Sequence, residues 1–98
     1  METKIRWKQK AVNQFAEAIK YIEKDSPLKA EKFEKEILKK IDNLLLQPER
    51  YPPDKFKNDN DGSYRAFEIF NYRISYRFIS NQIRILRIRH TKMTPLIY

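Results

Sequence analysis

The sequence has no cysteine, one glycine and one histidine among its 98 residues. The absence of cysteine excludes a disulfide framework and thiolate chemistry, and it is typical of proteins from a reducing compartment. With a single glycine there is no Gly-rich phosphate-binding loop, and no spacing of His, Asp and Glu resembles a metal site or a hydrolase triad. We therefore expect no metal ion and no cofactor.

The sequence also lacks a long hydrophobic run. No uninterrupted apolar segment reaches the length of a signal-peptide core or of a membrane-spanning helix. Apolar residues still make up 41% of the chain, which is enough for one modest core, and 98 residues are too few for two domains. We expect a single soluble domain over residues 1–98, located in the cytoplasm and without a membrane partner.

Negative charge is scarce in the last third of the chain. Between Tyr64 and Tyr98 the one acid is Glu68, whereas residues 1–63 hold 14 basic and 12 acidic residues. Most of the basic excess is arginine, whose planar guanidinium can bind phosphate or carboxylate through two hydrogen bonds. Such an excess does not determine a fold, so it indicates an anionic partner. The basic residues of this region are Arg65, Arg73, Arg77, Arg84, Arg87, Arg89 and Lys92.

Hydrophobic periodicity predicts the elements of the first half. Ile5 and Trp7 alternate with charged residues, which is typical of a short strand with one buried face. Apolar residues then recur at three- and four-residue intervals, as in amphipathic helices, and Ser26 followed by Pro27 has the chemistry of a helix start. The expected elements are a strand around residues 3–7, helices over 10–23 and 26–46, and an irregular loop over 49–63.

Three β-like runs follow, over residues 64–70, 72–79 and 83–89, with short turns at Asn71 and at residues 80–81. The order of strand, two helices, loop and three strands predicts an α+β fold. In this fold a helical hairpin packs on one face of an antiparallel sheet. The first strand is expected to pair with one of the later strands.

Alternation along the middle run separates Arg73 and Arg77 from the apolar residues. We expect their face of the sheet to be wet and cationic, and Arg73 to be an exposed cation whose removal costs little stability. Arg65, in contrast, shares its face with apolar neighbours. Arg87 and Arg89 also fall on an apolar face, unless a bulge, a twist or a partly buried second face intervenes.

Two strand motifs stand out: Asn71-Tyr72-Arg73-Ile74-Ser75-Tyr76-Arg77, and Ile85-Leu86-Arg87-Ile88-Arg89-His90 with Pro95 beyond it. Together with Tyr64-Arg65 and the order of elements, they resemble the RelE/ParE superfamily of toxins from type II toxin–antitoxin systems. The resemblance covers nearly the whole chain and implies the β-α-α-β-β-β fold of that superfamily. It also implies a growth inhibitor of the plasmid-stabilisation type, neutralised by a cognate antitoxin with an acidic segment.

The resemblance leaves two activities open. ParE-like members inhibit DNA gyrase, whereas RelE-like and YoeB-like members are mRNA interferases that cut mRNA on the ribosome without a metal ion. The strand end at residues 85–90 is close to ParE-like sequences, and Phe67 falls where RelE has its second catalytic lysine. We therefore favour gyrase inhibition, with the ribosome-dependent endoribonuclease as the alternative. A third, weaker interpretation is a non-toxic relative that only binds nucleic acid through its basic sheet.

For the ribonuclease alternative, the resemblance implies four catalytic residues. Arg73 matches the phosphate-binding arginine, His90 resembles the terminal-strand histidine of YoeB-like members, Arg65 takes the position of one RelE lysine, and Tyr98 is placed like the C-terminal tyrosine of RelE. Under either activity, the residues expected to bind phosphate or an acidic partner are Arg73, Arg77, Arg87, Arg89 and Lys92.

Simpler interpretations remain for each of these groups. His90 could only end a strand and bond a backbone group. The arginines could be solvated, or could bind the antitoxin alone. Tyr64, Tyr72 and Tyr76 could stack on nucleic-acid bases, but tyrosines at such positions are more often half-buried sheet residues.

Overall fold

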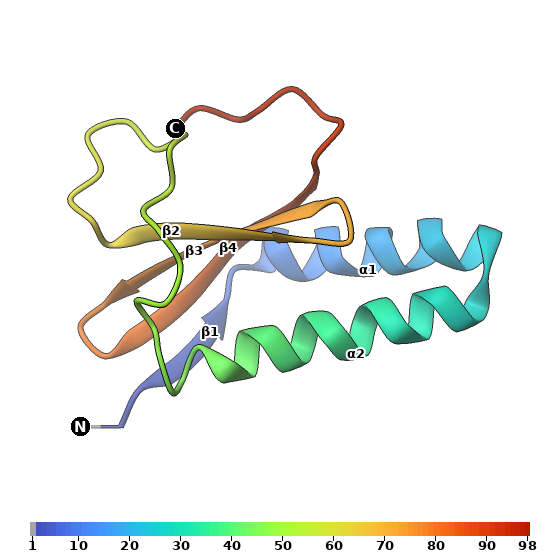
Figure 1. The fold of residues 1–98 in the computed structure, drawn as a ribbon, viewed down its shortest axis with the longest axis horizontal. Coiled ribbons are helices and arrows are strands. Elements are labelled where there is room, and N and C mark those ends of the chain that lie inside the picture. Colours follow the sequence, from blue (N-terminus) through green and yellow to red (C-terminus); the bar gives the residue numbers. More distant parts are fainter. Residues whose placement is uncertain (1) are drawn as a thin grey trace.

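The computed structural model describes residues 2–98, whose regular elements follow the predicted order (Figure 1). They are β1 (Lys4–Trp7), α1 (Gln9–Asp25), α2 (Pro27–Asn43), β2 (Tyr64–Ile69), β3 (Tyr72–Ile79) and β4 (Gln82–His90). The four strands form one sheet in the order β1-β4-β3-β2. Neither helix of this part of the chain is long and apolar enough to cross a membrane.

The sheet is mixed. Strands β2, β3 and β4 form the predicted antiparallel meander, whereas β1 pairs with β4 in parallel. Strands β1 and β2 are therefore the two edges. The outer edge of β2 is partly covered by the preceding loop, because Pro53 forms a bridge with Arg65 and the Asp54 amide donates to the Tyr64 carbonyl at 2.8 Å.

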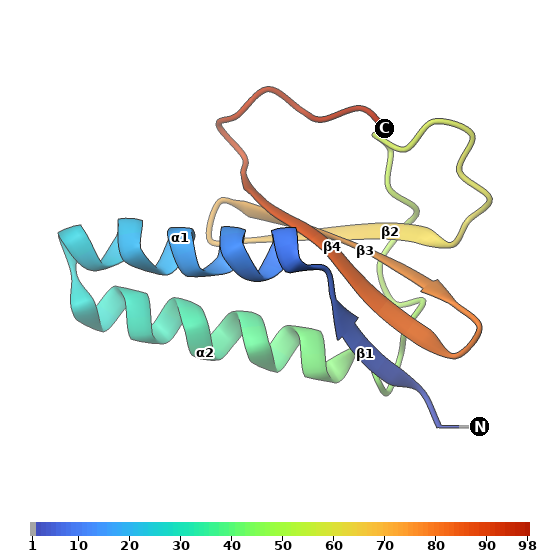
Figure 2. The ribbon, with the colours of Figure 1, turned by 180° about the vertical axis from the view of Figure 1, so that it is seen from behind.

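The α1–α2 hairpin lies along one side of the sheet (Figure 2). Its second helix starts as predicted: the Ser26 hydroxyl accepts a hydrogen bond of 3.2 Å from the Lys29 amide, and Pro27 occupies the first turn. The apolar stripes of both helices meet one face of the sheet, which leaves the other face without a helix. We call it the helix-free face. Buried core residues include Ala11, Phe33, Ile37, Ile41, Ile74, Tyr76, Ile83 and Ile85.

A β-bulge in β4 determines which arginines reach the helix-free face. Ser75 pairs with Arg87, but the next residue of β3, Tyr76, pairs with Ile85, so Leu86 is an extra residue. Paired residues share a face, and Arg87 therefore lies beside Ser75 while Ile85 stays in the core beside Tyr76. The bulge, one of the three explanations that the sequence left open, therefore accounts for the position of Arg87 and Arg89 on the helix-free face.

Both hairpin turns of the meander have two successive residues with positive φ. They are Phe70 and Asn71 (53° and 65°) and Ser80 and Asn81 (54° and 59°). This conformation is that of a type I′ turn, whose twist matches the strands it joins. Asn tolerates this conformation easily, whereas a bulky residue such as Phe70 adopts it rarely. The Phe70 ring lies near that of Phe33, with 6.2 Å between the ring centroids.

Two irregular segments meet beyond the helix-free face. One is the loop between α2 and β2, and the other is residues 91–98, which follow β4 and which we call the strap. In Figure 1 the strap, in red, returns toward the yellow-green loop. Backbone hydrogen bonds join them: the Tyr98 amide donates to Phe56 at 3.1 Å, and the Asn58 amide donates to Tyr98 at 2.6 Å.

Candidate functional site

Three of the predicted arginines lie side by side on the helix-free face. Arg73 pairs with Arg89 across β3 and β4, and Arg87 is the next residue of β4 on that face. Together with His90 they line a cavity of about 90 Å³. The remaining walls come from β2, the loop and the strap, and include Asp54, Phe56, Glu68, Met93 and Leu96.

A buried carboxylate organises this cavity. The side chain of Asp54 is 1% exposed, and its Oδ1 lies 2.7 Å from Nη2 of Arg73. The same oxygen accepts a hydrogen bond of 3.1 Å from the Phe56 amide, and Oδ2 accepts one of 2.6 Å from the Tyr98 hydroxyl. Asp54 thus connects the loop, the sheet and the strap. We call Asp54, Arg73 and Tyr98 the clamp.

Arg73 is not the exposed cation that the sequence predicted. Its side chain is 18% exposed, and it is paired with two carboxylates, Asp54 and Glu68, the latter at 3.0 Å. Burial alone would raise the pKa of Asp54, but hydrogen bonds from Tyr98, Arg73 and the Phe56 amide outweigh burial and lower that pKa below 3.8. The carboxylate is therefore ionised near neutral pH and neutralises Arg73.

The strap is fastened at Tyr98. Its hydroxyl donates to Asp54, and its backbone is hydrogen-bonded to the loop. The guanidinium carbon of Arg87 lies over its ring, 3.9 Å from the ring centroid. Burial raises the pKa of the Tyr98 hydroxyl, and the adjacent Asp54 carboxylate raises it further. This hydroxyl is consequently a fixed hydrogen-bond donor at neutral pH.

Arg87 and Arg89, the two β4 arginines that line the cavity, have no carboxylate partner among residues 2–98. Arg89 donates to the Thr94 carbonyl at 2.9 Å, and no ion pair reaches Arg87 or Arg89 from any residue in 2–98. Nε and Nη1 of Arg87 are buried without a hydrogen-bond partner there. Lys92 lies in the exposed part of the strap.

His90 borders the same cavity, at the end of β4. Its Nδ1 accepts a hydrogen bond of 3.0 Å from the Lys92 amide, and its ring meets the Tyr72 ring edge-on with centroids 4.9 Å apart. One ring nitrogen is thus already used to bond the backbone, as in the simpler interpretation. No cluster of three or more potential metal ligands occurs within residues 2–98.

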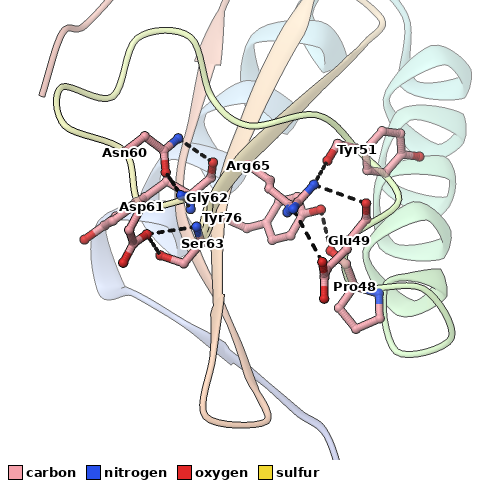
Figure 3. A network of polar contacts seen from close by, with 10 residues as sticks. Pro48, Glu49, Tyr51, Asn60, Asp61, Gly62, Ser63, Arg65 and Tyr76 are labelled. Atoms are coloured by element: carbon pink, nitrogen blue, oxygen red, sulfur yellow. Dashed lines mark hydrogen bonds and ion pairs between the residues drawn. The ribbon is translucent and has the colours of Figure 1, made fainter.

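Arg65 lies apart from this group, on the opposite face of the sheet. It pairs with Tyr76, whose side chain faces the core and donates to the Pro48 carbonyl at 2.7 Å. Figure 3 shows the Arg65 guanidinium directed at the loop, where Nη1 donates to the carbonyls of Tyr51 at 2.6 Å and Glu49 at 3.2 Å. Its contacts are those of an anchor for the loop.

Arg77 lies on the helix-free face but away from the cavity. Its Nε donates to the Ser63 hydroxyl at 2.9 Å, and it forms a longer ion pair of 3.6 Å with the exposed Asp61. Figure 3 shows the tight turn that presents these partners, in which Asp61 and Asn60 accept hydrogen bonds from Ser63 and Gly62.

The tyrosines do not form an open stacking surface. Tyr72 and Tyr76 are buried on the helix side of the sheet. Tyr64 is on the helix-free face, but Lys57 and Arg77 lie over its ring, at 4.8 and 4.5 Å from the centroid. The interpretation of these residues as sheet residues is confirmed for the two buried ones.

Sequence reasoning missed Asp54. An aspartate between a proline and a lysine in a polar loop looks exposed, and its contact with Tyr98 spans 44 residues, so no local pattern predicts it. The sequence does contain one sign that Arg73 is paired with an acid: Glu68, the single acid of β2, lies directly opposite it.

Comparisons of the sequence and of the fold with known proteins lead to the same family. The family model described as the ParE toxin of the parDE type II toxin–antitoxin system matches residues 5–95. The chain belongs to the ParE toxin family. A solved chain of the chromosomal ParDE toxin–antitoxin system from P. aeruginosa has the same fold: the TM-score is 0.71, with 19% identity over 93% of this chain and 98% of that one. No curated protein matches the chain.

This ParE-family protein is the toxin of a type II toxin–antitoxin system, and a cognate antitoxin is its partner. The resemblance noted in the sequence is therefore confirmed. The predicted fold is confirmed as well, with the addition that β1 joins the sheet in parallel.

Proposed function

We propose that this toxin acts in the cytoplasm and arrests growth by inhibiting DNA gyrase through protein contacts, without cutting RNA. Membership of the ParE family supports this target. The main observation behind the proposal is that Arg73 forms ion pairs with Asp54 and Glu68. Its guanidinium is therefore neutralised and is not free to bind a phosphate group.

Two of the other residues that the ribonuclease alternative would use, Arg65 and Tyr98, are also engaged elsewhere. Metal-free cleavage requires a base, an acid for the leaving oxygen and cations for the phosphate oxygens. Arg65 lies on the other face of the sheet, and the Tyr98 hydroxyl is held by Asp54 with a raised pKa. The arrangement therefore favours a binding surface over a proton-transfer site.

The proposal is tested by a supercoiling assay with relaxed plasmid, purified gyrase, ATP and increasing amounts of toxin. We expect inhibition that rises with toxin concentration and disappears with heat-unfolded toxin. Supercoiling that stays unchanged at a large molar excess of folded toxin would overturn the proposal.

One observation favours the ribosome-dependent mRNA endonuclease as a second candidate: His90, Arg73, Arg87 and Arg89 border one cavity. Primer extension on ribosome-bound mRNA after toxin induction tests this activity. Cuts at codon boundaries that depend on His90 would support it, and their absence would remove it.

A further inference from the structure

The helix-free face carries a second set of cations, outside the cavity. Strand register places Arg6 of β1 opposite Arg84 of β4, and Arg84 opposite Arg77 of β3. Ile5 and Trp7 pack against the core, so Arg6 between them faces the helix-free side with the other two. We call Arg6, Arg84 and Arg77 the arginine row. In Figures 1 and 2, β1 and the turn between β3 and β4 lie away from the strap.

The arginine row is open and poorly neutralised. Arg6 and Arg84 are exposed, and within residues 2–98 no carboxylate lies within ion-pair distance of either. Arg84 has one long hydrogen bond, of 3.4 Å, to the neutral side chain of Gln82. Arg77 has an acidic partner, Asp61, at 3.6 Å, but that aspartate is exposed and the pair is weak. The row therefore presents most of its positive charge to solvent.

Neither folding nor solubility explains the row. Like charges directly opposite each other in a sheet destabilise it. Lys and Arg on an edge strand discourage pairing of like chains, which accounts for Arg6 on β1. This does not account for Arg84 and Arg77, which lie on the two interior strands of the sheet. Aligned cations that oppose folding at interior positions are better explained by an anionic ligand.

We propose that the arginine row binds the phosphate backbone of duplex DNA without reading its base sequence. A guanidinium can form two hydrogen bonds with one phosphate group. Neighbouring strands of a sheet lie about 4.8 Å apart, so the row extends over about 10 Å. One strand of B-DNA carries a phosphate for about every 3.4 Å along its axis, so this length faces about three phosphates, one for each arginine.

The composition of this surface fits DNA better than a protein partner. The centre of a protein–protein interface is apolar and depleted of charged residues. Protein–DNA interfaces are more polar and much more positively charged. The row has the second character, because three arginines are aligned there and the exposed Lys4 lies beside them on β1.

A single strand fits the row less well than a duplex. Proteins that bind single strands combine cations with open aromatic rings. Trp7 packs on the core side beside Phe15, with 5.5 Å between the ring centroids. Lys57 and Arg77 lie over the ring of Tyr64. The row thus offers charge and forked donors but no free aromatic surface. The choice of DNA as the duplex rests on the proposed function, because gyrase acts on duplex DNA.

The test measures binding of the folded full chain to a fluorescently labelled DNA duplex, two helical turns long and of arbitrary sequence, by fluorescence anisotropy. Three phosphate contacts predict a slope of about −3 for the logarithm of the association constant against the logarithm of the salt concentration. Binding should therefore be saturable and should weaken about fortyfold between about 50 and 200 mM salt. A second duplex of unrelated sequence should bind equally well.

Charge-removing variants locate the site. Arg6→Gln and Arg84→Gln each remove one phosphate contact, so each should weaken binding at low salt about tenfold and bring the slope closer to zero by about one. The matched control is Lys39→Gln, the same charge change at an exposed position of α2, and it should leave the slope unchanged. Circular dichroism verifies folding. The urea midpoint of Arg84→Gln should not fall, because the change relieves repulsion between like charges.

Three results would overturn the proposal. Absence of saturable binding to the duplex at about 50 mM salt would mean that the row does not bind DNA. A wild-type salt slope in both arginine variants would show that DNA binds elsewhere on this basic chain. Tighter binding of a thymidine oligonucleotide or of duplex RNA, lost in Arg84→Gln, would assign the row to that nucleic acid instead.

The readouts distinguish this inference from the gyrase proposal. Duplex binding that depends on the row, with supercoiling unchanged by the toxin, would support the row and contradict the gyrase target. Inhibition of gyrase by a toxin that does not bind the duplex would overturn the DNA site alone. If Arg84→Gln also weakened that inhibition, the row would be assigned to an acidic protein surface.

Discussion

The Tyr98 hydroxyl donates a hydrogen bond of 2.6 Å to Oδ2 of Asp54, and this contact closes the strap over the helix-free face. Asp54 holds Arg73 with its other oxygen, so one buried carboxylate fixes both the strap and the central arginine of the sheet. The clamp and the strap together cover Arg73, Arg87 and Arg89 on this face.

The first prediction concerns the strap. Tyr98→Phe keeps the ring under Arg87 but removes the donor to Asp54, so the free energy of unfolding should fall by about 1.5–3 kcal/mol. Urea denaturation measures this loss, and hydrogen exchange should accelerate at the Asn58 amide, which bonds the Tyr98 carbonyl. Unchanged exchange at Asn58 would mean that the hydroxyl does not hold the strap. Tyr21→Phe, at an exposed helix position, is the control.

The second prediction concerns pH. The pKa of Asp54 is lower in the folded protein than its ordinary value of 3.8, because hydrogen bonds from Tyr98 and Arg73 outweigh the opposing effect of burial. The stabilisation is therefore complete above that value and is lost as the pH falls through 3.8 toward the folded-state pKa. Urea denaturation of the wild type and of Asp54→Asn across this range should show a flatter acid limb in the variant. Parallel pH profiles would contradict this role of Asp54.

The third prediction concerns Arg73. Arg73→Ala leaves the Asp54 carboxylate buried without the cation that is paired with it, so the free energy of unfolding should fall by about 2–3 kcal/mol. Arg77→Ala is the matched control on the same strand face, and it should cost less because its acidic partner is exposed. Equal losses in the two variants, measured by urea denaturation, would show that the clamp contributes no special stability. Any toxicity assay of Arg73→Ala must therefore be corrected for folded protein.

The fourth prediction concerns the loop anchor. Arg65→Ala removes two hydrogen bonds to loop carbonyls and should destabilise the protein by about 1–2 kcal/mol. Arg65→Lys keeps the charge but lacks the fork of donors, so it should recover only part of this loss. Limited proteolysis should detect faster cleavage near Tyr51 in both variants. Full recovery by lysine would indicate that charge, not the forked contact, anchors the loop.

Much of the fold could be predicted because each element has a local cause. Ser26 and Pro27 mark the start of α2, the turns at Asn71 and Asn81 tolerate positive φ, and alternation along β3 assigns its two faces. The second helix ends at Asn43, three residues before the predicted end, because Leu44 packs into the core in a turn that does not continue the helix.

The site was less predictable because it depends on distant contacts. The sequence named Arg73, Arg87, Arg89 and His90, and the structure brings them together. Two features determine what these residues contact. The bulge at Leu86 places Arg87 and Arg89 on the helix-free face, and the buried Asp54 pairs with Arg73. Neither has a local signature, since a bulge is a property of two paired strands and the burial of Asp54 requires the strap.

Plasmid topology in living cells tests the central claim most directly. Linking-number distributions of a reporter plasmid are measured on chloroquine gels before and after induction of the toxin, with total mRNA mapped from the same cells. Gyrase inhibition predicts a shift toward relaxed topoisomers at the onset of growth arrest, with intact mRNA at codon boundaries. Growth arrest with unchanged plasmid supercoiling and codon-bounded cuts in mRNA would contradict the account.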